Sequence, residues 1–234
     1  TNNFIDGNVP PYFWRYTLTM TTKLSNNKLL SLVLLAIPLV LIYVPFAKFP
    51  WHIGGIGLVV LLLTWLQDRN LKALNFKTIT GKTILTAIVL WIILELSMDF
   101  IVQPLITRIL NEPADYGVFA GLEGKTKTYW KMLGYMWISA AIGEELLFRG
   151  YVFAQLKKII GDQKLVSILI SAVLFSVPHL YQGTAGLITT FIFGLAFGFI
   201  YVRYQNLYLN IIVHGLIDSF FLTMAYLGYL SFFG

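Results

Sequence analysis

Residues 140–150 read AAIGEELLFRG, an apolar run that two adjacent acids and an arginine interrupt. Glu145 and Arg149 are four residues apart, so on a helix they share one face and can form an ion pair. Glu144 is turned by about 100° from Glu145 on a helix, so its carboxylate points elsewhere. The small residues before the acids allow a neighbouring helix to approach closely. The stretch predicts a helix inside a bundle with one neutralised and one free carboxylate, although the ion pair could simply hold the bundle together.

The whole chain has the composition of an integral membrane protein. Of its 234 residues, 57% are hydrophobic and 12% are charged, whereas soluble domains carry roughly 25% charged residues. So few charges cannot cover the surface of a soluble protein, and a disordered chain would not be this apolar. The absence of cysteine excludes disulfides and a thiol nucleophile. The formal charge of +6 is spread between apolar runs without forming a basic stripe, so we expect membrane lipids, and no nucleic acid, as partners.

Apolar segments of near-spanning length follow a polar amino-terminal segment, residues 1–28. Because a helix needs about 20 residues to cross the hydrocarbon, we predict one all-α, polytopic membrane domain over residues 29–234 with about eight transmembrane helices. The expected segments are 29–46, 51–66, 84–110, 129–156, 166–180, 185–204 and 207–233, the last being long enough for two short spans broken near Gly228 or earlier. The distribution of basic residues predicts a multi-pass protein of the cell membrane with a cytoplasmic amino terminus.

Ionisable side chains recur inside the later apolar segments, where each costs about 2.5–3.5 kcal/mol near mid-bilayer. Pro178 removes a helical hydrogen-bond donor and leaves His179 near a kink, where its ring can lean into a cavity. His214 and Asp218 share a helix face. Asp218 could orient His214, or both could face a site that binds substrate or a metal, and the spacing does not decide between these. So many polar groups together predict a polar cavity inside the bundle.

Glu95 and Asp99 form a further acidic pair on one face of segment 84–110. Two carboxylates without a basic neighbour repel each other, so one is protonated or a residue from another helix reaches them. We treat them as candidate supports of the site, the alternative being a helix end that dips into the membrane interface.

Three motifs within residues 129–219 resemble, in order and spacing, those of the CPBP family. This family comprises the type II CAAX prenyl endopeptidases and bacterial relatives that include bacteriocin-processing and self-immunity proteins. The motifs are Glu144-Glu145-x-x-x-Arg149, Phe175-x-x-x-His179 and His214-x-x-x-Asp218. The resemblance implies an all-helical intramembrane protease with about eight spans around a polar cavity.

The resemblance also implies roles for the motif residues. Glu144, helped by His179, would activate the attacking water, and His214 with residue 218 would support the oxyanion of the tetrahedral intermediate. The family takes Asn or Asp at the last position, and an ionised carboxylate cannot donate to an oxyanion as an amide can. Asp218 is therefore expected to orient His214 or to be protonated. The residues left to shape the site or bind substrate are Phe175, Glu145 and Arg149.

A metal-free mechanism is favoured over a zinc site. Glu144, His179 and His214 would give zinc three ligands and an open position, as in catalytic zinc sites. The chain lacks His-Glu-x-x-His, the usual helical zinc-binding pair. We therefore expect no cofactor, with zinc as the alternative.

The predicted function is hydrolysis of peptide bonds in membrane-associated or prenylated (CAAX-type) proteins or peptides. One alternative is a catalytically idle member that acts as a bacteriocin-immunity or regulatory binding protein, although every motif residue is present. The other is a proton-coupled transporter, because intramembrane carboxylates and histidines also build proton relays. The chain shows no paired repeat of the kind that transporters carry.

Overall fold

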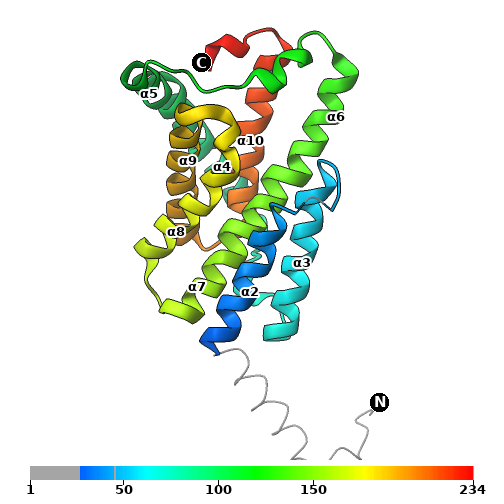
Figure 1. The fold of residues 1–234 in the computed structure, drawn as a ribbon, viewed down its shortest axis with the longest axis vertical. Coiled ribbons are helices and arrows are strands. Elements are labelled where there is room, and N and C mark those ends of the chain that lie inside the picture. Colours follow the sequence, from blue (N-terminus) through cyan, green and yellow to red (C-terminus); the bar gives the residue numbers. More distant parts are fainter. Residues whose placement is uncertain (1–26, 45, 234) are drawn as a thin grey trace, which may run out of the picture.

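A computed structural model describes residues 27–44 and 46–233, which fold into helices joined by turns and contain no strand (Figure 1). The predicted all-α fold is confirmed for this part of the chain. The polar segment 1–28 lies outside the described residues except for its last two. Asn27 caps the first helix there, because its side chain accepts a hydrogen bond from the backbone N–H of Leu30 at 3.1 Å.

The longer helices run in chain order, some of them joined end to end without a turn. They are α2 (Lys28–Leu41), α3 (Trp51–Asp68), α4 (Gly81–Ser97), the π-helix η2 (Met98–Val102), α5 (Gln103–Leu110), α6 (Thr126–Met136), the π-helix η4 (Trp137–Tyr151), α7 (Val152–Ile160), α8 (Lys164–Ser176), the 3-10 helix η5 (Val177–Gln182), α9 (Gly183–Tyr204) and α10 (Leu207–Tyr226). Short 3-10 turns are η1 (Lys72–Leu74), η3 (Gly117–Leu122) and η6 (Leu230–Phe232).

Four helices of the described residues are long and apolar enough to cross a membrane, so the predicted count of about eight is not confirmed. They are Trp51–Asp68, Gly81–Leu110, Lys164–Tyr204 and Leu207–Tyr226. The continuous helix from α6 to α7 is not among them, because it carries the acids and bases of the first motif. The pair of short spans considered for residues 207–233 is wrong: α10 is one helix, and the chain turns at Gly228, where φ is 85°.

The first motif lies on the central helix of the bundle. η4 packs against α3, α10 and α8, and α2 packs against α7, its continuation (Figure 1). Close approach of α3 depends on Gly143, where a Cβ would lie 2.7 Å from Ile53 Cγ2 and 3.2 Å from the Ile53 carbonyl oxygen. The expectation that small residues before the acids permit close packing is confirmed.

The turns that carry most of the basic residues gather at one end of the bundle. The end of α3, the α7–α8 turn and the α9–α10 turn lie at the lower end in Figure 1, beside the start of α2. Lys77 Nζ donates to the carbonyl oxygen of Tyr204 at 3.1 Å, and the Leu207 N–H donates to that of Asn75 at 3.0 Å. This grouping follows the charge pattern of the sequence, and a cytoplasmic position for this end stays a prediction.

Candidate active site

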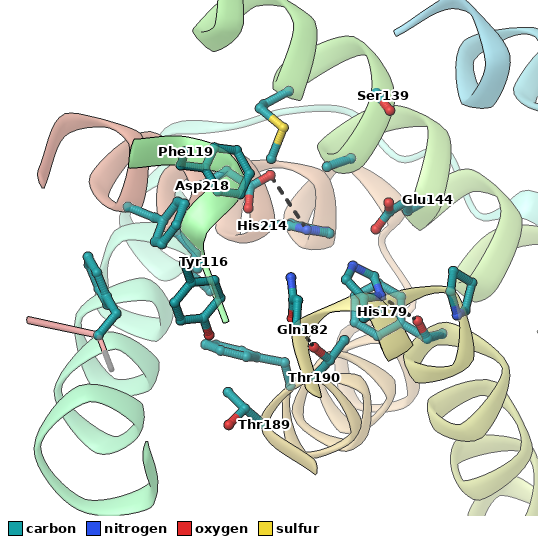
Figure 2. A pocket seen from close by; sticks show the side chains of 18 of the residues that line it. Tyr116, Phe119, Ser139, Glu144, His179, Gln182, Thr189, Thr190, His214 and Asp218 are labelled. Carbon is teal, nitrogen blue, oxygen red and sulfur yellow. Dashed lines mark hydrogen bonds and ion pairs between the residues drawn. The ribbon is translucent and has the colours of Figure 1, made fainter. Parts of the chain in front are cut away.

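A cavity of about 460 Å³ lies among η4, η5, α9, α10 and the α4–η2 helix. All four residues predicted to be catalytic line it: Glu144, His179, His214 and Asp218 (Figure 2). Its other titratable groups include Glu95 and Asp99, and its described lining contains no lysine or arginine. The helices therefore bring residues of three motifs, spread over 75 residues of sequence from 144 to 218, to one cavity inside an apolar bundle.

Glu145 lies behind the cavity wall and holds three side chains. Its Oε1 accepts from Arg149 Nη1 at 2.9 Å and from His214 Nδ1 at 2.9 Å, and its Oε2 accepts from Asn210 Nδ2 at 3.2 Å. The predicted ion pair with Arg149 is present, with both side chains 0% exposed. An ionised carboxylate only accepts, so His214 carries a proton on Nδ1. Glu145 thus sets the orientation of the His214 ring.

Arg149 and Phe175 pack against each other beside Glu145. The guanidinium lies over the Phe175 ring, 4.2 Å from its centroid, and its Nη2 donates to the Gly194 carbonyl oxygen at 3.3 Å. Gly194 admits this contact between helices, because a Cβ there would lie 2.9 Å from Ala172 Cα. Arg149 therefore neutralises Glu145 while an aromatic face and a carbonyl surround its own charge.

His214 presents its Nε2 toward Asp218 at the cavity. The ring is 5% exposed and stacks on Phe197, with the centroids 4.8 Å apart. The distance from Nε2 to Asp218 Oδ2 is 3.7 Å, which suits an ion pair but is too long for a hydrogen bond. Glu145, and not Asp218, makes the hydrogen bond expected to orient the ring. The spacing of residues 214 and 218 indicated only that the two side chains are neighbours.

His179 faces Glu144 from the opposite wall of the cavity (Figure 2). α8 ends at Ser176, and Pro178 lies in the first turn of η5, so the predicted break is confirmed. His179 Nδ1 lies 3.0 Å from the Phe175 carbonyl oxygen. A carbonyl only accepts, so Nδ1 carries a proton, and Nε2 is the ring nitrogen that is left without this bond. The half-buried Glu144 carboxylate and the His179 ring thus share one cavity, as general acid–base chemistry requires.

Glu95 and Asp99 form an acidic wall of the cavity. They are 9% and 8% exposed, and their hydrogen bonds come from their own continuous helix. Trp91 Nε1 donates to Glu95 Oε2 at 3.0 Å, and Gln103 Nε2 donates to Asp99 Oδ1 at 2.8 Å.

Another segment reaches this wall through Tyr116, whose hydroxyl donates to Gln103 Oε1 at 3.3 Å. Burial raises the pKa of Tyr116, which lies in the connection between α5 and α6, so the phenol remains a donor. The expected contact from another part of the chain is therefore indirect, because it passes through Gln103.

The side chains considered as zinc ligands share the cavity without forming a metal site. Within residues 27–44 and 46–233, no group of three or more His, Cys, Asp or Glu side chains is placed to hold a metal ion. Glu144, His179 and His214 as arranged therefore do not fit zinc, and we derive no step through a metal. A metal-free mechanism stays a prediction that elemental analysis can test.

Two polar residues of the site, Asn210 and Gln182, belong to none of the three motifs and were not predicted from the sequence. Asn210 is fully buried, and its Nδ2 donates to the Phe197 carbonyl oxygen at 2.9 Å as well as to Glu145. Its place four residues before His214, in an otherwise apolar stretch, was an available signal. Gln182 ends η5 and lines the cavity three residues after His179.

The motif-bearing part of the chain matches a known family. The model of the family described as Type II CAAX prenyl endopeptidase Rce1-like matches residues 126–220. This region runs from the start of α6 into α10 and contains all three motifs, so the resemblance to the CPBP intramembrane proteases is confirmed there. No curated protein and no solved structure matches the chain. The four apolar helices indicate a multi-pass membrane protein, and the family that residues 126–220 match is one of peptidases.

Proposed function

We propose that the protein is an intramembrane endopeptidase that uses Glu144 to activate water. The single observation that carries the proposal is that the two adjacent acids, Glu144 and Glu145, have different surroundings. Glu145 is fully enclosed by Arg149, His214 and Asn210, whereas Glu144 faces the cavity opposite His179. The Glu145 carboxylate therefore has a structural role, and the Glu144 carboxylate is free to accept a proton.

The hydrolysis would proceed through a tetrahedral intermediate. As a water oxygen bonds to the carbonyl carbon, one water proton passes to Glu144 and the π electron pair moves onto the carbonyl oxygen. The His179 Nε2 lone pair accepts a hydrogen bond from the same water and orients it. When the intermediate collapses, the C–N bond breaks and Glu144 gives its proton to the leaving amine. The new carboxylic acid then ionises.

His214 would stabilise the oxyanion. With Nδ1 tied to Glu145, the ring can donate from Nε2 when it is doubly protonated. The ring is held between Phe197 and Glu145, so the donor is oriented before substrate arrives. Such preorganisation is what makes a donor effective in a site that excludes most water.

The proposed substrates are membrane-associated or prenylated proteins or peptides. Apolar side chains line the part of the cavity formed by α6, η3 and α10, among them Phe119, Met132, Met136 and Phe221. An apolar peptide segment or a lipid group gains free energy by leaving water for such a surface. The lining thus supports an apolar group beside the scissile bond.

The test is cleavage by the purified protein in lipid nanodiscs, with paired peptide panels that differ only in a prenyl group. We expect cleavage by the wild type and its loss in Glu144→Gln, which keeps the shape of the side chain and removes the base. Glu123→Gln, at an exposed acid outside the cavity, serves as the matched control and should retain activity. Cleavage that persists in Glu144→Gln refutes the proposal, and the ratio between the panels identifies the substrate class.

A further inference from the structure

The cavity wall opposite His214 offers a neutral donor that no motif contains. The family resemblance implies that residue 218 supports the oxyanion, and an ionised carboxylate there only accepts. Gln182 lines the same cavity and is 7% exposed. We propose that Gln182 supplies the oxyanion hydrogen bond that an ionised Asp218 cannot donate. This inference rests on the proposed function, because it assigns the second donor of that reaction.

The hydrogen bonds of Gln182 orient its amide. Its Oε1 lies 3.3 Å from Thr190 Oγ1, whose single hydrogen is shared with the nearer Gly186 carbonyl oxygen at 2.8 Å. Its Nε2 donates to the Tyr181 hydroxyl at 3.1 Å. An amide nitrogen carries two hydrogens, so one remains after this bond. Figure 2 shows the nitrogen end of Gln182 pointing toward His214, away from Thr190.

The backbone around Gln182 is built to keep the side chain in this place. The Asp115 N–H donates to the Gln182 carbonyl oxygen at 2.9 Å, which ties the end of η5 to the α5–α6 connection. Gly186 leaves the space that the side chain occupies, because a Cβ there would collide with Gln182 Cβ and lie 3.1 Å from its Oε1. A donor held this way needs little reorganisation when charge develops.

The other glutamine of the cavity is bound at both ends of its amide within the acidic wall. Gln103 is also 7% exposed, but its Nε2 donates to Asp99 at 2.8 Å and its Oε1 accepts from Tyr116. Its amide thus belongs to the acidic wall.

In the reaction the proposed donor acts without losing a proton. As the water oxygen bonds to carbon and the π pair moves to the carbonyl oxygen, the free N–H of Gln182 hydrogen-bonds that oxygen alongside His214. The electron pair returns to form the product carbonyl when the C–N bond breaks, and the amide is unchanged.

The experiment compares Gln182→Met with Gln155→Met in the nanodisc cleavage assay. Gln155 lies in α7, outside the cavity, is 1% exposed, and donates from its Nε2 to Gln67 Oε1 at 2.8 Å. Its substitution therefore controls for the loss of a buried amide. Removing one oxyanion donor lowers kcat by about 10²–10³-fold, and we expect this for Gln182→Met with KM little changed. Gln155→Met should keep kcat. Affinity for a phosphinic peptide, whose oxygen imitates the oxyanion, should fall in parallel with kcat/KM in Gln182→Met.

Each other outcome is decisive. A wild-type kcat in Gln182→Met overturns the inference, as does an equal loss of kcat in both methionine variants, which would indicate a structural role. Gly186→Ala should reproduce the loss by displacing Gln182. If Glu144→Gln is inactive while Gln182→Met is active, this inference fails and the proposed function stands. If Glu144→Gln still cleaves the peptide, the proposed function is refuted, and the inference that rests on it is refuted with it.

Discussion

The buried pair of Glu145 and Arg149 allows stability and catalysis to be separated. Both side chains are 0% exposed and joined at 2.9 Å, so Arg149→Met leaves an uncompensated carboxylate inside the bundle. Breaking a buried pair on one side costs about 3–5 kcal/mol, whereas replacing both partners by apolar residues is often neutral. We therefore expect Arg149→Met to be strongly destabilised and Glu145→Leu/Arg149→Met to recover most of the lost free energy of unfolding.

Activity should behave differently from stability in the same variants. The double variant has no carboxylate at His214 Nδ1, so the ring loses the 2.9 Å hydrogen bond that orients it. We expect the double variant to fold but to cleave no peptide. The assays are denaturant unfolding in a mild detergent and turnover in nanodiscs.

The control is the exposed pair of Lys164 and Asp162, which lie 3.9 Å apart with side chains 61% and 68% exposed. Removing Lys164 should change stability by less than about 1 kcal/mol. The reasoning is refuted if the double variant is as unstable as Arg149→Met, or if it retains wild-type turnover.

Further predictions concern packing, the support of Glu145 and the metal. Gly143→Leu should destabilise the bundle by about 1–3 kcal/mol or more, because the new side chain would collide with Ile53. Gly134→Leu, where a Cβ meets open space, should not destabilise it. Melting temperatures in detergent distinguish the two variants. Asn210→Leu should lower stability by about 1–3 kcal/mol, because Glu145 Oε2 loses its donor, and should lower kcat more than it raises KM. Cleavage should survive exhaustive chelation in protein without metal by elemental analysis; activity restored only by zinc would contradict the metal-free reading.

The membrane environment of the chain and the contacts within single segments were predictable from the sequence alone. A chain with 57% hydrophobic and 12% charged residues must place most of its length in lipid, where helices satisfy the backbone. The four-residue spacing of Glu145 and Arg149 and the break at Pro178 are properties of a single segment, so they needed no tertiary information. The same holds for the free carboxylate of Glu144, because adjacent residues on a helix point in different directions.

Contacts between helices were decided only by the tertiary structure. The Glu145 bond to His214 spans 69 residues of sequence, and the helical period cannot tell which of two nearby carboxylates reaches the ring. The predicted number of spans is not confirmed, because charged residues inside the α6–α7 helix reduce its hydropathy and the apolar tail after α10 forms only a short 3-10 turn. Gln182 has no motif at all. Its side chain lies in the cavity because Gly186 leaves room for it and its oxygen lies beside Thr190, and both contacts depend on how the end of η5 folds against α9.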